Sequence, residues 1–181
     1  MGIENVVVAG GGVLGSQIAY QAAYKGFNVT VWLRSEGSID RAKPKFEQLR
    51  QTYVETLEAM KTDPAAYCRG LADSPELAAD QIDQLKQKAQ QAFEAIRFTT
   101  SYEQAACNAD LVIEAIAEDP AQKDAFYAEL AKYLPEQTIL VTNSSTLLPS
   151  QMAQATGRPE KFLALHFANR IWRNNTAEVM G

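Results

Sequence analysis

Short apolar runs alternate with longer amphipathic stretches along the chain. Several of these runs, such as VVVA and TILVT, have almost no polar position. Runs of this kind are typical of parallel strands that are covered by helices on both faces. The pattern predicts strands at residues 5–9, 28–33, 96–99, 111–116, 138–142 and 162–167. We therefore expect an α/β fold with a doubly wound, mostly parallel sheet.

Helix signals occupy the intervals between these strands. Residues 16–25 are rich in alanine and are followed by Gly26, a residue type that commonly terminates helices. Asp119 and Pro120 fit the N-cap and the first turn of another helix. Gly157 is expected to close a third helix. Because helices follow strands in turn, the chain is predicted to consist of βαβ units.

One long interval between the second and third predicted strands contains no strand pattern. Within residues 39–96, apolar side chains recur every three or four positions in two stretches, 39–60 and 77–96. This spacing predicts a long helical hairpin, inserted between the two strands, whose apolar stripes pack on each other. Ser74 and Pro75 are candidates for the start of its second helix.

A glycine-rich sequence joins the first predicted strand to the first predicted helix. Gly10, Gly12 and Gly15 form the pattern G-x-G-x-x-G, with Val13 and Leu14 between the last two glycines. The first glycine permits a tight turn, the second lets the backbone approach a pyrophosphate, and the third lets helix and strand pack closely. The N–H groups at the start of the helix then face the phosphates. The pattern predicts that these five residues bind a dinucleotide.

The end of the second predicted strand bears on the choice between NAD and NADP. NAD-binding chains usually carry an acidic residue there, which binds the ribose hydroxyls. This chain has Leu33 followed by Arg34, and a guanidinium can bind a 2′-phosphate through two parallel hydrogen bonds. Glu36 could fold back toward the ribose and restore a preference for NAD. We expect NADP to bind at least as well as NAD.

Composition and charge exclude several classes of protein. Of the 181 residues, 46% are hydrophobic and 22% are charged, which is typical of a globular domain. The net charge of −5 argues against a nucleic-acid partner, although phosphate-bearing small ligands remain open. No apolar run approaches the ~20 residues that span a bilayer, and the start does not match a secretory signal. Cys68 and Cys107 lack metal-ligand spacing, so we expect reduced packing residues, no metal, no membrane partner and a cytoplasmic location.

The single histidine of the chain, His166, ends the last predicted strand. A lone histidine in an apolar run is more often a core residue than a catalyst. Here, however, it lies at the carboxyl end of a strand, where α/β sheets bind ligands, and another strand ends in the polar cluster TNSST at residues 142–146, which contains Asn143 and Ser145. Glu178 follows in a second short apolar stretch. A base, an acid that orients it and a hydroxyl donor are the groups needed to move a proton during hydride transfer.

Four segments in order resemble the NAD-binding domain of the 3-hydroxyacyl-CoA dehydrogenases, especially the stand-alone bacterial members and the related diketoreductases. They read GGGVLGSQIA, DLVIEAIAED, TNSSTLLPS and LHFANRIWRNNTAEVMG, and the resemblance covers nearly the whole chain. It implies a Rossmann-type fold and an oxidoreductase that interconverts 3-hydroxyacyl and 3-ketoacyl substrates. The expected substrate is a CoA thioester, and the default cofactor of the family is NAD.

The resemblance also implies roles for individual residues. His166 would remove or return the hydroxyl proton, Glu178 would pair with its other ring nitrogen, and Ser145 would bind the substrate oxygen. Three further residues, Glu118, Lys123 and Asn143, match positions that bind the cofactor in the family. Asn169 matches a position on the substrate side.

The family continues into a helical second domain that forms much of the acyl-CoA site and makes the homodimer. We therefore expect residues 1–181 to be the cofactor domain, with little turnover alone. One alternative is a diketoreductase, hydroxyacid or sugar-acid dehydrogenase of the same superfamily. The hydroxyacid type uses a lysine on a later helix, which would leave His166 and Glu178 unexplained. Another is a non-catalytic NAD(P)-binding module, which would have no need of these residues and Ser145 together.

Overall fold

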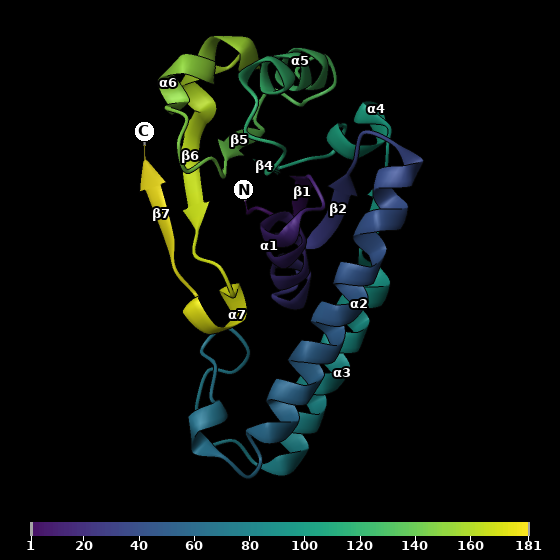
Figure 1. Cartoon of the computed structure of the whole chain (residues 1–181), viewed down its shortest axis with the longest axis vertical. Coiled ribbons are helices and arrows are strands. Elements are labelled where there is room, and N and C mark those ends of the chain that lie inside the picture. The colour runs from purple at the N-terminus through teal and green to yellow at the C-terminus, as the bar shows by residue number, and fades with distance from the viewer. Residues whose placement is uncertain (1, 181) are drawn as a thin grey trace.

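The computed structural model describes residues 2–180, which contain one seven-stranded sheet (Figure 1). The strand order across the sheet is β3-β2-β1-β4-β5-β6-β7, and only the last pair is antiparallel. The strands are β1 (Asn5–Ala9), β2 (Asn28–Trp32), β3 (Arg97–Thr99), β4 (Leu111–Glu114), β5 (Ile139–Thr142), β6 (Phe162–Phe167) and β7 (Ala177–Met180). The predicted α/β fold is confirmed, with six strands within two residues of their expected ends and β7 added.

Helices connect the strands and cover both faces of the sheet. They are α1 (Val13–Tyr24), α2 (Glu36–Ala59), α3 (Ala79–Ala95), α4 (Tyr102–Ala106), α5 (Pro120–Leu130), α6 (Pro149–Met152) and α7 (Ile171–Asn174). Asp119 caps α5 through the backbone N–H groups of Ala121 and Gln122, as the sequence predicts. Gly157 ends the short turn after α6 in the left-handed region, with φ of 67°. None of the described helices is long and apolar enough to cross a membrane.

Strand β1 contributes to two separate hydrophobic cores. Val6 and Val8 pack in the core that includes α1, α2 and α3, whereas Val7 and Ala9 pack in the core that includes α4 and α5. Because successive side chains of a strand point to opposite faces, a strand between two helical layers has no position for an exposed polar residue. This burial explains why the run is apolar throughout.

The predicted helical hairpin is present as α2 and α3, which lie side by side and extend away from the sheet (Figure 1). Ser35 begins α2, where its side chain accepts a hydrogen bond from the Ser38 N–H. The predicted start of the second helix at Ser74 is wrong. Ser74 instead closes a local turn with the Glu76 N–H, and α3 begins after Ala78, whose N–H donates to the Gln81 side chain at 2.9 Å. That single contact satisfies the N–H of the N-cap residue, while no capping side chain accepts from the first turn.

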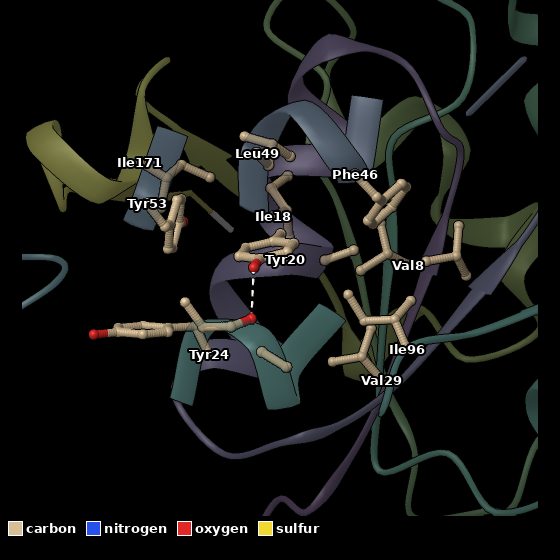
Figure 2. Packing of buried hydrophobic residues seen from close by; sticks show 14 of the residues in the cluster. Val8, Ile18, Tyr20, Tyr24, Val29, Phe46, Leu49, Tyr53, Ile96 and Ile171 are labelled. Atoms are coloured by element: carbon tan, nitrogen blue, oxygen red, sulfur yellow. Dashed lines mark hydrogen bonds between the residues drawn. The ribbon is translucent and has the colours of Figure 1, made fainter. Parts of the chain in front are cut away.

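Buried tyrosines join the hairpin to α1 (Figure 2). The Tyr20 hydroxyl donates to the Ala89 carbonyl oxygen at 2.7 Å, and the Tyr53 hydroxyl donates to Gln21. Burial raises the pKa of Tyr53 well above its ordinary value, so its hydroxyl stays protonated as a donor. Since each of these buried hydroxyls has a partner, the rings pack without an unsatisfied polar group. The hairpin is thereby fixed to the helix that begins at the glycine-rich loop.

The two cysteines are free thiols, as expected. Cys68 is buried, but Cys107 is exposed, so the expectation that both are packing residues is wrong for Cys107. Cys107 directly follows the two buried alanines that end the short helix α4, but it is itself exposed, as is Asn108 after it. Within residues 2–180, no group of three or more potential metal ligands is present.

Candidate active site

The glycine-rich loop between β1 and α1 leaves an open cradle above one glycine. Gly10 has a φ of 118°, and a Cβ there would lie 2.3 Å from the Ala115 carbonyl oxygen. A Cβ on Gly15 would lie 2.7 Å from the Gly10 carbonyl oxygen. At Gly12, by contrast, a Cβ would meet no atom within 4 Å. The fold itself therefore requires the first and third glycines, whereas the second faces open space.

The start of α1 supplies hydrogen-bond donors to this space. Gly12 is the N-cap and carries no side chain that could satisfy the first turn. The N–H groups of the first turn of a helix have no partner within the helix and carry its positive dipole end. Val13 and Leu14, in that turn, line the adjoining cleft. The arrangement favours an anion such as a pyrophosphate.

Two clefts meet at this loop. The larger, of about 650 Å³, is lined by Gly10, Gly11, Gly12, Trp32, Leu33, Arg34, Ser38, Tyr102, Ala115, Ile116, Ala117, Gln122, Ala125 and Phe126. The smaller, of about 270 Å³, is lined by Gly12, Val13, Leu14, Gly15, Ala115, Ile116, Glu118, Asn143, Ser145 and His166. Three residues, Gly12, Ala115 and Ile116, belong to both linings. Together the clefts form one groove along the carboxyl ends of the parallel strands.

The end of β2 presents a cation to the larger cleft. Leu33 is buried at the position where NAD-binding chains usually carry an acidic residue, and the exposed Arg34 follows it. Both residues line the cleft together with Ser38 from the first turn of α2. Glu36 is exposed and is not among the lining residues. The residues at this end therefore leave a guanidinium, and no carboxylate, on the cleft wall.

Hydrogen bonds fix the wall of the smaller cleft. The Glu118 carboxylate accepts from the Ser144 hydroxyl at 2.7 Å and from the Thr146 hydroxyl at 3.3 Å. The Asn143 side-chain oxygen accepts from the Phe167 N–H at 3.0 Å. These contacts join the segments after β4 and β5 to each other and to the last residue of β6. They hold Glu118 and Asn143, both expected in the cofactor site, on one wall.

A buried ion pair lies beneath that wall. Glu114 lies at the end of β4, and its two carboxylate oxygens accept hydrogen bonds from the Lys123 ammonium at 2.7 and 2.8 Å. Neither side chain is exposed. The same carboxylate accepts from the Tyr127 hydroxyl at 2.6 Å, the Thr142 hydroxyl at 2.8 Å and the Ile116 N–H at 2.8 Å. Burial and the neighbouring Glu114 raise the pKa of Tyr127, which keeps it a donor. Lys123, expected to line the cofactor pocket, lies below its surface with its Nζ 3.8 Å from Glu118.

The paired strands β6 and β7 bring His166 and Glu178 opposite each other. Their Cα atoms are register partners in the antiparallel ladder. Side chains that are directly opposed in such a ladder leave the same face with Cβ atoms about 4.5–5.5 Å apart. His166 is half-buried in the smaller cleft with Ser145, whereas Glu178 is exposed. No hydrogen bond joins the two side chains among the contacts of the described residues, so the structure supplies proximity rather than a formed pair.

Residues 5–181 match the family model for the 3-hydroxyacyl-CoA dehydrogenase, NAD binding domain. The chain belongs to this family. The fatty acid oxidation complex subunit alpha of Pseudomonas syringae pv. syringae is 30% identical over 98% of this chain and 21% of its own length. The chain therefore spans about a fifth of that curated relative.

Solved structures agree with this family membership. A diketoreductase structure is 44% identical with a TM-score of 0.79, and the match covers 100% of this chain and 56% of that one. The 3-hydroxybutyryl-CoA dehydrogenase from Escherichia coli K12 is 27% identical with a TM-score of 0.73, covering 99% of this chain and 32% of that one. The names describe those two proteins, and both structures share the fold of this chain.

The cleft geometry fits the dinucleotide that this 3-hydroxyacyl-CoA dehydrogenase-family domain binds. The open space above Gly12 and the uncapped start of α1 are suited to a pyrophosphate. The larger cleft adjoins this space on one side, and the smaller cleft, whose lining includes Glu118, Asn143 and His166, adjoins it on the other.

Sequence reasoning missed one part of this wall, and the structure places another expected residue outside the smaller cleft. Ser144, which is buried and bonded to Glu118, lies in the predicted polar cluster but was not singled out. Asn169, expected beside the substrate, is not in the lining of the smaller cleft, and its side-chain oxygen accepts from Gln17 Nε2 at 2.9 Å. Nothing in the local sequence indicates that Gln17, on α1, approaches it.

Proposed function

We propose that the protein containing this chain is an NAD(P)-dependent oxidoreductase that interconverts a 3-hydroxyacyl and a 3-ketoacyl substrate. The observation that carries the proposal is the shared lining of one cleft by the glycine-rich loop, Ser145 and His166, with Glu178 opposite His166 on β7. These groups come from three distant segments. A binding module without chemistry would not require a titratable pair beside the dinucleotide cradle.

The proposed chemistry divides the reaction between the cofactor and the chain. The bound nicotinamide supplies or accepts the hydride at the carbon that bears the oxygen. His166 holds the proton of the substrate hydroxyl on one ring nitrogen, accepting it in oxidation and returning it in reduction. The Glu178 carboxylate accepts the N–H of the other nitrogen, which fixes the tautomer and stabilises the imidazolium. Ser145 donates a hydrogen bond to the substrate oxygen.

Arg34 supports a further proposal, that the cofactor is NADP as readily as NAD. Its guanidinium lies on the wall of the larger cleft, and no carboxylate shares that position. A carboxylate would repel a 2′-phosphate, whereas a guanidinium forms charge-assisted hydrogen bonds to it. The family default remains NAD, so the proposal concerns the relative affinity of the two.

The substrate and assembly of the whole protein are also proposals. The family and the fatty acid oxidation relatives support an acyl-CoA substrate. A helical second domain and a homodimer are proposed from the family resemblance of the sequence alone. The diketoreductase structure, at 44% identity, favours a second candidate in which the substrate is a dicarbonyl compound without CoA. Both candidates use the same His166 chemistry and differ in what the rest of the substrate contacts.

Substrate choice tests the proposal directly. We expect the natural enzyme to reduce acetoacetyl-CoA while it oxidises NADH or NADPH. The reaction is measured as the loss of absorbance of the reduced nicotinamide. Comparison with a neutral 3,5-diketo ester separates the two candidates, because this ester is a dicarbonyl compound that lacks CoA. Turnover of the diketo ester alone would favour the diketoreductase. Reduction of neither substrate by enzyme that binds the cofactor would contradict both.

A further inference from the structure

Ser144 lies between two residues that line the smaller cleft, Asn143 and Ser145, but it is not itself a lining residue. It is only 2% exposed, so its hydroxyl is buried beneath the cleft wall. A buried hydroxyl is costly unless it forms hydrogen bonds within the protein. The partners of this hydroxyl therefore show which parts of the wall it holds in place.

The Ser144 hydroxyl joins two segments of the wall. It donates to Glu118 Oε2 at 2.7 Å, and its oxygen accepts from the Leu147 N–H at 3.0 Å. The Thr146 N–H approaches the same oxygen at 3.4 Å. Glu118 belongs to the segment after β4, and the two N–H groups belong to the turn after β5. One hydroxyl thus acts as donor to the first segment and as acceptor from the second.

The accepted hydrogen bonds shape the turn that carries Ser145. The turn closes around Ser145, because the Ser144 oxygen binds backbone N–H groups on the far side of it. On the near side, the Ser144 N–H donates to Thr142 Oγ1 at 3.1 Å, and the Thr142 hydroxyl donates to the buried Glu114 at 2.8 Å. The backbone on both sides of the exposed Ser145 is therefore attached to buried groups. These attachments set the direction in which the Ser145 side chain leaves the backbone.

The donated hydrogen bond orients Glu118. One carboxylate oxygen accepts from the Ser144 hydroxyl, and the other lies 3.8 Å from the Lys123 Nζ. The Glu118 side chain is 44% exposed, and an unrestrained side chain at such a position would lose rotamer freedom when it binds a ligand. With a contact at each oxygen, the carboxylate already has one orientation before the cofactor arrives. Groups that are ordered in advance bind and react with less loss of entropy.

We propose that Ser144 is a positioning residue for both ligands of the site. Through the hydrogen bond that it donates, it orients Glu118 toward the cofactor. Through those that it accepts, it orients Ser145 toward the substrate oxygen. The inference rests on the proposed function, which assigns Ser145 to that oxygen, and on the place of Glu118 in the smaller cleft. Ser144 acts on each ligand only through one neighbour.

Ser144→Ala in the natural enzyme tests this proposal. Calorimetric titration with NADH gives the cofactor affinity, and kcat is measured with acetoacetyl-CoA or the diketo ester, whichever is reduced faster. Thr138→Val is the matched control, because it removes a buried hydroxyl that donates to the Ala109 carbonyl oxygen at 2.6 Å, at the opposite end of β5. Ser144→Cys, which keeps the volume and supplies only a weak donor, serves if Ser144→Ala does not fold.

We expect Ser144→Ala to bind NADH about threefold to tenfold more weakly and to lower kcat about tenfold to a hundredfold. In a Glu118→Ala background, Ser144→Ala should cause little further loss of NADH affinity. In a Ser145→Ala background, it should cause little further loss of kcat, because residues that act as one unit are not additive. Thr138→Val should lower the thermal midpoint and leave both quantities unchanged.

A purely structural role of Ser144 predicts a different pattern. Equal losses of NADH affinity with and without Glu118 would overturn the proposal, as would equal losses of kcat with and without Ser145. Wild-type affinity and kcat in Ser144→Ala would overturn it too. Failure of the proposed function is a separate result, in which the wild-type enzyme reduces no 3-keto substrate. The NADH titrations need no turnover, so they test the link between Ser144 and Glu118 in that case as well.

Discussion

At the scale of single residues, the three glycines of the dinucleotide loop have different requirements. Gly10 and Gly15 have backbone atoms within 3 Å of a built Cβ, whereas Gly12 has none within 4 Å. Loss of Gly10 or Gly15 therefore disturbs the fold. Loss of Gly12 leaves the fold intact and obstructs only a ligand that approaches the loop.

Gly12→Ala should abolish dinucleotide binding while the thermal midpoint stays close to that of the wild type. The added methyl group occupies the space in which we place the pyrophosphate. Gly15→Ala is the matched comparison, and it should lower the midpoint because its methyl group meets the Gly10 carbonyl oxygen. Calorimetry with NADH and a thermal melt on each variant provide the two readings. Wild-type affinity in a folded Gly12→Ala protein would show that the phosphates lie elsewhere.

Arg34→Ala should weaken NADPH binding selectively. The guanidinium lies on the wall of the larger cleft, and a hydrogen bond to a charged group contributes roughly 1.5–3 kcal/mol, or about tenfold to a hundredfold in affinity. NADH, which has no 2′-phosphate, should lose little. The measurement is the ratio of the two dissociation constants in wild type and variant. An unchanged ratio would mean that Arg34 is only a solvated surface residue.

At the scale of elements, the ends of β4 and β5 and the helix α5 are held together by one carboxylate. Glu114 accepts hydrogen bonds from Lys123, Tyr127, Thr142 and the backbone of Ile116. Removal of one partner of a buried pair is strongly destabilising because the other charge is left in a medium that solvates it poorly. The wall that carries Glu118 and Asn143 thus depends on a group that does not itself line the cleft.

Glu114→Gln should destabilise the chain by about 3–5 kcal/mol in urea unfolding, because it leaves the Lys123 ammonium buried without a full counter-charge. The control is Glu129→Gln, which removes the partner of Lys132 in an exposed pair and should have little effect. Equal small effects of the two substitutions would indicate that water reaches the Glu114 site and screens it.

The sequence predicted the elements well where burial was uniform. The apolar run of β1 and the stripes from Ile39 onward gave nearly correct bounds, because β1 is covered on both faces and the hairpin is covered along one stripe of each helix. Strand β7 was not predicted as a strand, since all four of its residues are exposed and show no alternation. The start of α3 was misplaced because the contact that begins it comes from Gln81, a side chain inside the helix.

At the scale of the whole molecule, the candidate site is assembled from segments that are far apart in the sequence. The carboxyl ends of β1, β5 and β6 bring the glycine loop, Ser145 and His166 to one cleft. This convergence follows from parallel topology, so it was predictable once the strands were assigned. The contacts of Asn169 with Gln17 and of Lys123 with Glu114 were not, because they depend on where helices pack on the sheet.

The central claim is that His166 moves a proton and that Glu178, opposite it on β7, assists. Its most direct test is kcat of His166→Gln in the natural enzyme, measured beside NADH affinity and the thermal midpoint. We predict a kcat lower by about 10²–10⁴, with cofactor affinity and stability nearly unchanged. Glu178→Gln should also lower kcat, and the double variant should lose less than the product of the two losses. A stable, cofactor-binding His166→Gln enzyme with wild-type kcat would contradict the account.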